Sequence, residues 1–394
     1  MKLLVLTPFL PYPLDSGGNT RVFNLLRQLG LHGVQIVVGV ITAELFDQAV
    51  INHLKEFLPN ITFLKLPYRV SRIRKALYFT ANLFGLDRIL CHRDTTRAIL
   101  DIVAREGIDL IQVEFSQVAR YLPSTPCPAI LICHEFRSRV LQKERGFKKG
   151  ACQKILAFLV ERIVGREELS HVPRYQAAVC MSHTEAEWLK GRCPTRHVEV
   201  IGNGVDLGAF SFKAINGLPH GLYYIGWFTN RQNGIGLDFF LDAIWPLIRS
   251  QCPDFVVVGK DLDRERHTRL EREGIPYLGF VETPELVRRV QGRLLLVPLR
   301  SGSGTRLKIL EAMAMGNPVI STAIGIEGIR AEDGRHYVHA ETADDFRRAI
   351  QDLMTQPSLA EEIATQARAL VEREYGWASL ADKQMQVYDR IRHP

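Results

Sequence analysis

A basic pair follows a glycine-rich loop in the second half of the chain. The apolar run 294–298 leads into a loop that contains Gly302 and Gly304. Arg306 and Lys308 come next, at the start of a segment with helical period. A helix N-terminus carries partial positive charge, so two cations there make sense if an anion binds beside them. Because loop glycines let backbone N–H groups approach a phosphate, the pattern predicts a diphosphate site.

Glu311 lies three residues after Lys308, on the same face of the predicted helix. Its neighbours Leu310, Ala312 and Met313 are apolar, and an unpaired carboxylate is costly among them. Glu311 is therefore either an internal ion-pair partner of Lys308 or an acceptor for ligand hydroxyls. An isolated pair would favour the first interpretation, and the glycine-rich loop before it favours a ligand.

Two features of the N-terminal half also point to a ligand. Gly17 and Gly18 join the first apolar run to an amphipathic segment, and a double glycine permits close backbone approach, although any strand-to-helix turn can use glycine. His134 follows the apolar run 128–133, which predicts a place at the carboxyl end of a strand. A lone histidine is more often structural, but this context favours a functional role over that alternative.

The elements that must position these residues form two series. Short apolar runs alternate with segments of helical period, which predicts parallel sheets with helices on both faces. The expected class is α/β, with two doubly wound Rossmann-like domains that face each other across a cleft. We expect an N-terminal domain at 1–204, a linker at 205–220, a C-terminal domain at 221–374 and a C-terminal helix at 375–394. The predicted strands are 2–7, 34–41, 61–66, 109–114, 128–133 and 177–181, then 221–226, 255–259, 276–280, 294–298 and 318–322.

Composition narrows the function classes. The 394 residues are 46% hydrophobic and 24% charged, as in a water-soluble globular enzyme, and no apolar run is long enough to span a bilayer. The prolines after residue 7 argue against a signal peptide, and seven scattered cysteines are best explained as reduced thiols, so we expect a cytoplasmic protein. The net charge of +7 favours anionic partners without choosing among phosphates, nucleic acid and acidic lipids.

The stretch GSGTRLKILEAMAMGNPVIST, followed by Gly325 to Gly328, resembles the donor site of family 4 glycosyltransferases. Further similar segments occur in the same order along nearly the whole chain. They are residues 8–21 with Gly17 and Gly18, His134 with Glu135, the VIGNGVD segment 200–206, residues 279–281, and 375–377. The resemblance implies the GT-B fold and a retaining hexosyltransferase-type enzyme that takes its sugar from a nucleoside diphosphate sugar.

The resemblance also implies roles for particular residues. Glu311 would bind the donor ribose, Arg306 and Lys308 the phosphates, and His134 would lie near the transferred sugar. Many relatives have another glutamate where this chain has Ser303, so sugar contacts are expected from backbone amides of Ser303, Gly304 and Thr305. Relatives often carry a cation after the first strand of the C-terminal domain, where only Arg231 could serve.

No metal or other cofactor is expected. Asp261 and Asp263 resemble the metal-binding carboxylates of the other main glycosyltransferase fold, but the charged residues that follow favour a solvated helix start. Two basic apolar stretches, 69–88 and 137–166, fit an anionic membrane surface about as well as they fit packing on the N-terminal core.

The expected function is sugar transfer to a glycan, lipid-linked or small-molecule acceptor in polysaccharide biosynthesis, at the inner face of a membrane. A sugar-nucleotide epimerase of the same fold is the first alternative, but it would need clustered acid/base carboxylates and histidines. A non-catalytic anion-binding protein is the second. No nucleic-acid partner is expected, because no recognised binding motif accompanies the positive charge.

Overall fold

The computed structural model describes residues 1–14, 16–42, 47–67, 93–122, 124–146, 150–193, 197–215, 217–251, 254–301 and 306–393. They form two compact units. The first contains Met1–Gly202 and Leu380–Pro394, and the second contains Asn203–Ser379. The predicted α/β class with two parallel sheets is confirmed.

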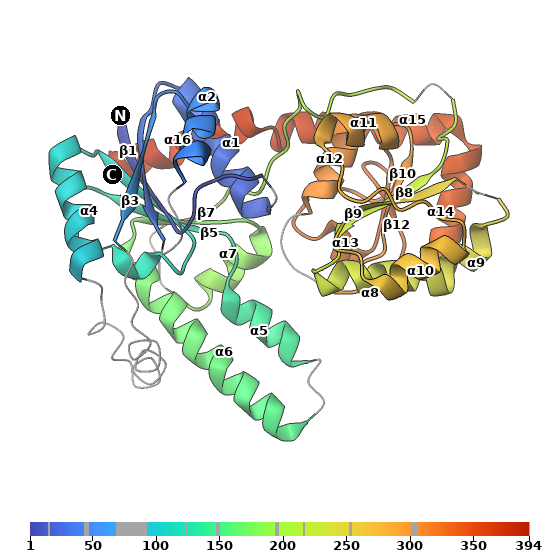
Figure 1. The fold of residues 1–394 in the computed structure, drawn as a ribbon, viewed down its shortest axis with the longest axis horizontal. Coiled ribbons are helices and arrows are strands. Elements are labelled where there is room, and N and C mark those ends of the chain that lie inside the picture. The colour runs from blue at the N-terminus through green and yellow to red at the C-terminus, as the bar shows by residue number, and fades with distance from the viewer. Residues whose placement is uncertain are drawn as a thin grey trace. The chain divides into compact units, whose positions relative to one another are not determined.

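The described part of the first unit contains a sheet of seven parallel strands in the order β3-β2-β1-β4-β5-β6-β7. The chain adds β2 and β3 on one side of β1 and then β4 to β7 on the other side, so the strand order reverses between β1 and β4 (Figure 1). Ligands of such sheets bind outside the carboxyl ends of the strands at this reversal. The strands are β1 (Lys2–Thr7), β2 (Gln35–Ile41), β3 (Ile61–Leu66), β4 (Leu110–Glu114), β5 (Ala129–Cys133), β6 (Ala177–Cys180) and β7 (His197–Val200).

The helices of the first unit cover this sheet, and two of them extend away from it as a pair, α5 and α6 (Figure 1). Central strands are continuous apolar runs because helices bury both of their faces, as at Leu3 and Leu4, which are fully buried. The helices are α1 (Gly17–Leu31), α2 (Gln48–Phe57), α4 (Arg93–Glu106), α5 (Arg137–Arg145), α6 (Ala151–His171) and α7 (His183–Lys190).

The second unit contains, in its described residues, a sheet of five strands in the order β12-β11-β10-β8-β9. Its strand order reverses between β8 and β10, which pair in parallel. The strands are β8 (Leu222–Trp227), β9 (Phe255–Lys260), β10 (Leu294–Val297), β11 (Val319–Ser321) and β12 (Val338–His339).

The helices of the second unit follow the strands in alternation. Residues 237–248 are divided among the end of α8, a π-helical turn (Phe240–Ile244) and α9. The helices are α8 (Arg231–Phe239), α9 (Trp245–Ile248), α10 (Arg264–Arg272), α11 (Thr283–Val290), α12 (Leu307–Met315), α13 (Ala323–Ile326), α14 (Ala343–Thr355) and α15 (Pro357–Glu374).

Two stretches differ from the sequence interpretation. Residues 276–280, predicted as a strand, form only an isolated bridge between Val257 and Tyr277, because Pro276 has no N–H and Gly279 turns the chain at φ 66°. Residues 205–220, predicted as a linker, belong to the second unit. Val205 bridges Gly376 there, and Phe210 is buried in the core.

The last helix, α16 (Trp377–Arg392), begins in the second unit and ends in the first. Within the first unit, Asp382 of α16 meets His32 at the end of α1, with 2.8 Å between the carboxylate and Nε2. Tyr388 is fully buried and donates to Gln112 of β4. The end of the chain is therefore part of the core of the N-terminal sheet.

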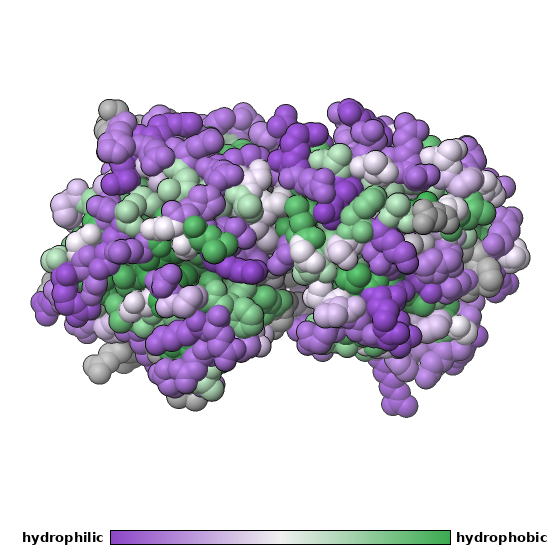
Figure 2. All heavy atoms as spheres, turned by 90° about the horizontal axis from the view of Figure 1, so that it is seen from above, coloured by the Kyte–Doolittle hydropathy of each residue, from purple (hydrophilic) through white to green (hydrophobic). Residues whose placement is uncertain are grey.

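The face of the molecule in Figure 2 carries mostly hydrophilic side chains, with smaller hydrophobic patches among them. Within the described residues, no helix combines the length and the apolar character needed to cross a membrane.

Candidate functional site

The ammonium group of Lys308 lies at the strand-order reversal of the second sheet. Lys308 is the second residue of α12, which follows β10, and its Nζ donates to the backbone oxygen of Ile225 in β8 at 2.6 Å. It also donates to Oδ1 of Asn233 at 2.9 Å. The charge is thereby fixed in place by two neutral oxygen atoms rather than by a carboxylate, so it keeps its attraction for an anion.

Asn233 was not singled out from the sequence, yet it orients Lys308. Its side-chain amide donates to the backbone oxygen of Trp227 at 2.9 Å, which turns Oδ1 towards Lys308. The space for this side chain depends on Gly226, because a Cβ there would lie 2.8 Å from Cγ of Asn233. The sequence alone could not reveal the contact between Asn233 and Lys308, because the pairing of β8 with β10 brings these residues together.

Glu311 does not pair with Lys308. No hydrogen bond or ion pair joins its partly exposed carboxylate to any residue in the described part of the chain. Burial raises the pKa of Glu311 to about 7, although Lys308 opposes the shift. Of the two interpretations of Glu311, the internal ion pair is therefore wrong, and a carboxylate with unused acceptor capacity remains.

Burial also lowers the pKa values of the two cations, Lys308 and Arg306. It lowers the pKa of Lys308 to about 7, an effect that the Arg306 charge reinforces and Glu311 opposes. Burial likewise lowers the pKa of Arg306, the residue that immediately precedes α12. Two partly buried cations in one place raise each other's free energy, and a bound anion would relieve that cost.

The remaining predicted donor residues are less defined. Arg231 is exposed and begins α8, two residues before Asn233, so the start of α8 lies beside Lys308. Ser303, Gly304 and Thr305 lie outside the described residues. Gly316 adopts the left-handed conformation at φ 82° that closes α12.

His134 occupies the carboxyl end of the first sheet, one residue after β5. Its Nε2 lies 2.5 Å from Oε2 of Glu114, the last residue of β4. The imidazole stacks on the Phe115 ring, with 3.7 Å between centroids and 11° between planes. Burial lowers the pKa of His134 although Glu114 opposes the shift. A carboxylate can only accept, so Nε2 carries the proton and Nδ1 faces away with its lone pair.

Gly18 belongs to the same group. A Cβ at Gly18 would lie 3.0 Å from Cζ of Phe115, so glycine lets the start of α1 approach the ring that stacks on His134. Phe115 itself adopts φ 71°, which is unusual for an aromatic residue and turns the chain sharply after β4. Gly17 is the first residue of α1, and the Ser16 side chain caps that helix by accepting from the Asn19 N–H.

A buried polar network holds Glu114. Gln112, on the same strand, donates to Oε1 of Glu114 at 2.5 Å, while its own side-chain oxygen accepts from Tyr388 and Gln384 of α16. Arg21 of α1 is completely buried, and its guanidinium donates to the backbone oxygen of Gly202. Burial lowers the pKa of Arg21 to about 10, although Glu114 and Tyr388 oppose the shift. His134 is thus oriented by residues distant in sequence.

Asp261 and Asp263 lie just before a helix, as predicted. Asp263 caps α10 by accepting from the Arg266 N–H at 3.0 Å, and Asp261 accepts from the indole N–H of Trp227. Within the residues that the structure describes, no group of three or more histidine, cysteine or acidic side chains could hold a metal ion.

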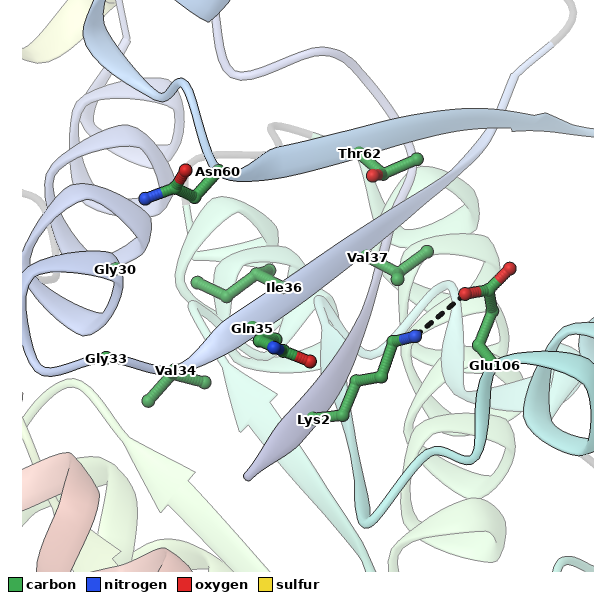
Figure 3. A pocket seen from close by; sticks show the side chains of 10 residues that line it. All are labelled: Lys2, Gly30, Gly33, Val34, Gln35, Ile36, Val37, Asn60, Thr62 and Glu106. Atoms are coloured by element: carbon green, nitrogen blue, oxygen red, sulfur yellow. Dashed lines mark hydrogen bonds and ion pairs between the residues drawn. The ribbon is translucent and has the colours of Figure 1, made fainter.

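A cavity of about 400 Å³ lies at the opposite edge of the first sheet from His134. It opens at the amino ends of β1 to β3, where the Lys2 and Glu106 side chains point toward one another and pair at 2.8 Å (Figure 3). Its charged groups are thus already satisfied. The lining residues are Lys2, Gly30, Gly33, Val34, Gln35, Ile36, Val37, Asn60, Thr62 and Glu106.

Part of the sequence and the whole fold are similar to known proteins. Residues 219–356, which contain Lys308 and Glu311, match the family model Glycosyl transferases group 1. The whole chain superposes on sucrose-phosphate synthase from Thermosynechococcus elongatus with a TM-score of 0.71 at 17% identity, covering 99% of each chain. The chain has the GT-B fold, and its residues 219–356 are similar to group 1 glycosyltransferases.

Two further similar proteins span nearly the full length of this chain. The structure of HepE from Anabaena in complex with UDP superposes with a TM-score of 0.69 at 14% identity, covering 99% of this chain and 100% of that one. An uncharacterized 44.6 kDa protein in the cps region of Klebsiella pneumoniae is 22% identical over 392 residues, which is 95% of this chain and 96% of the relative.

Proposed function

We propose that this glycosyltransferase moves a sugar, with retention of anomeric configuration, from a nucleoside diphosphate sugar to a glycan, lipid-linked or small-molecule acceptor. The observation that carries the proposal is the ammonium of Lys308, held by Ile225 and Asn233 beside a second cation and a carboxylate that pairs with no described residue. Such a cluster suits a diphosphate and the hydroxyls of the attached ribose.

In this proposal Lys308 and Arg306 bind the donor phosphates and Glu311 accepts from the ribose hydroxyls. Negative charge on the diphosphate grows as the bond to the sugar breaks, so a fixed cation stabilises the transition state more than the ground state. Backbone amides of Ser303, Gly304 and Thr305 are proposed to contact the donor, and Arg231 to add a further cation. We propose that no metal ion takes part, so a chelator should leave the rate unchanged.

His134 is proposed to act on the transferred sugar rather than on the nucleotide. Its Nε2 proton is directed to Glu114, and lowering of its pKa by burial favours the neutral ring, so Nδ1 is available to accept from a sugar hydroxyl. Gly17 and Gly18 are proposed to let the backbone of the α1 start approach the substrate.

UDP is the first nucleotide to test, because the similar HepE structure is a complex with UDP. We also propose a role in polysaccharide biosynthesis, at an anionic membrane surface on the cytoplasmic side, where a lipid-linked acceptor would be met. The similarity to a protein of a cps region and the net charge of +7 support that setting.

Thermal unfolding with UDP, GDP, ADP, CDP and TDP tests the donor part, because a ligand selective for the folded state raises the melting temperature. We expect one of them to stabilise the protein, and the matching UDP- or GDP-sugar to be consumed in the presence of acceptor glycans. NMR of the product then gives the anomeric configuration. Absence of both stabilisation and sugar transfer across the series would reject the donor site.

A further inference from the structure

The helices α5 and α6 form a hairpin whose base is fixed to the first sheet. Glu168, near the end of α6, accepts from the backbone N–H groups of Arg137 and Ser138 at 2.7 and 3.1 Å, so it caps the start of α5. It also accepts from the Ser138 and Ser116 hydroxyls at 2.8 and 3.2 Å. These bonds fix the hairpin to the first sheet, and the other end extends away from it (Figure 1).

The distal half of α6 exposes a cluster of large apolar side chains. Ile155 and Leu156 are 61% and 62% exposed, Leu159 is 47% exposed, and Phe158 is 38% exposed. Thirteen large hydrophobic residues are exposed in the described part of the chain, and four of them fall within these five positions. Sequence alone left open whether this stretch packs on the core, and the structure shows that its distal part does not.

One outward face of α6 changes character along its length. Ile155, Leu159, Arg162 and Arg166 follow one another at spacings of four, three and four residues, so they lie in one line along the helix. All four are exposed. The face is therefore apolar towards the end of the hairpin and cationic towards the sheet.

The charges on this hairpin are not balanced within it. Glu161 pairs with Arg145 and Glu167 pairs with Arg120, each at 3.3 Å. In contrast, no described carboxylate pairs with Lys154, Arg162 or Arg166. Among the described groups the surface thus carries excess positive charge next to exposed apolar side chains.

A groove of about 500 Å³ runs between the two helices at the distal end of the hairpin. Arg145 and Lys154 place cationic groups along it, and Ile155 and Phe158 give it apolar walls. The Arg145 guanidinium lies 5.0 Å from the Phe158 ring centroid, and Arg162 lies 5.6 Å from it. A groove with cationic and apolar walls suits an amphiphile with an anionic head.

We propose that the α5–α6 hairpin docks this glycosyltransferase on an anionic lipid bilayer. Ile155, Leu156 and Leu159 enter the boundary between headgroups and acyl chains, while Arg162 and Arg166 lie at the level of the lipid phosphates. This order along α6 matches the order of layers in a bilayer, which is apolar inside and anionic at its surface. The inference deepens the proposed function, because it names the surface that meets a lipid-linked acceptor.

A second copy of the chain is the competing occupant of the apolar cluster. Charge favours the bilayer, since two copies that meet through this face would bring Arg162 and Arg166 of each copy together. The exposed patch of four side chains is also smaller than the surface that a stable dimer buries. An anionic bilayer offers both an apolar interior and a negatively charged surface, so it fits this face better than a second copy does.

Co-sedimentation of the full chain with vesicles tests the proposal. We expect binding to phosphatidylcholine vesicles that contain phosphatidylglycerol, weak binding to phosphatidylcholine alone, and release as sodium chloride is raised. Ile155→Ser/Leu159→Ser should weaken binding by about tenfold or more, because two exposed apolar side chains lose their burial in lipid. Arg162→Gln/Arg166→Gln should weaken it by about fivefold for each charge removed.

Leu31→Ser and Arg105→Gln are matched controls, since Leu31 is 74% exposed and the Arg105 side chain 66% exposed on the same unit away from the hairpin. Both should bind vesicles like the wild type. All variants should keep the wild-type melting shift with UDP, so loss of lipid binding and loss of donor binding are read separately. Equal binding to neutral and anionic vesicles would overturn the proposal. So would wild-type binding by both hairpin variants, or a dimer in lipid-free sedimentation that Ile155→Ser/Leu159→Ser abolishes.

Discussion

His134 and Glu114, which end neighbouring parallel strands, are joined by a hydrogen bond of 2.5 Å between Nε2 and Oε2. The residue after Glu114, Phe115, stacks on the imidazole, so one face and one edge of the ring are fixed by consecutive residues. A ring held in this way has a single tautomer, and its Nδ1 points in a fixed direction. The geometry is suited to positioning a substrate hydroxyl.

His134→Ala should lower kcat at least tenfold and leave the affinity for UDP nearly unchanged, because the proposed phosphate site at Lys308 lies in the second unit. Glu114→Gln keeps the imidazole but removes the charge that raises its pKa, so the acidic limb of the pH–rate profile should move to lower pH. Steady-state kinetics with calorimetric UDP titrations measure both effects. Wild-type turnover in a folded His134→Ala variant would assign the histidine to structure alone.

Lys308→Met keeps the apolar stem of the side chain and removes its charge. Loss of a buried charge contact costs roughly 2–5 kcal/mol, so kcat/KM for transfer should fall at least tens-fold. Asn233→Ala is the matched test of orientation, because it removes one of the two oxygens that hold the ammonium. Circular dichroism must show that both variants fold. A folded Lys308→Met enzyme with normal kcat/KM would place the diphosphate elsewhere.

Binding of a nucleoside diphosphate should depend on pH around neutrality. The pKa of Lys308 is about 7 in the ligand-free protein, so near pH 8 most of the lysine is neutral and must gain a proton to face an anion. We expect weaker UDP binding as pH rises through 7 and net proton uptake at pH 8. Calorimetry in buffers of different ionisation enthalpy measures the uptake, which Lys308→Met should abolish. Proton release at pH 8 would contradict the assignment.

Glu311→Gln should stabilise the ligand-free protein at alkaline pH. The folded-state pKa of Glu311 is about 7, above its ordinary value of 4.5, so its contribution to stability is present below about pH 4.5 and lost as pH rises through 7. The glutamine variant should therefore exceed the wild type at pH 8 by roughly 1–2 kcal/mol, after allowance for partial exposure. The difference should shrink towards pH 4.5. Urea unfolding at both pH values measures it, and the same variant should bind UDP more weakly.

The sequence by itself determined the local elements and the kinds of residue at their ends. Apolar residues marked β1 and β3 with the observed bounds, because β1 is buried on both faces and the edge strand β3 alternates buried residues with more exposed ones. Gly316 marked the end of α12, since few other residues accept its backbone conformation. His134 at a strand end and Lys308 at a helix start were both readable, because such positions depend on neighbours in sequence.

Only the tertiary structure decided the partners of those residues. Lys308 meets Asn233, 75 residues away, and not Glu311 on its own helix, because β10 pairs with β8 and directs the side chain across the sheet. Glu114 is reached from the end of the chain through Gln112 and Tyr388, 276 residues apart. Sheet order and burial fix these contacts, and neither is encoded in a short window of sequence. The local sequence pattern identified the residues that could do chemistry. The packing of the sheets determined their hydrogen-bond partners, their pKa shifts and their orientation.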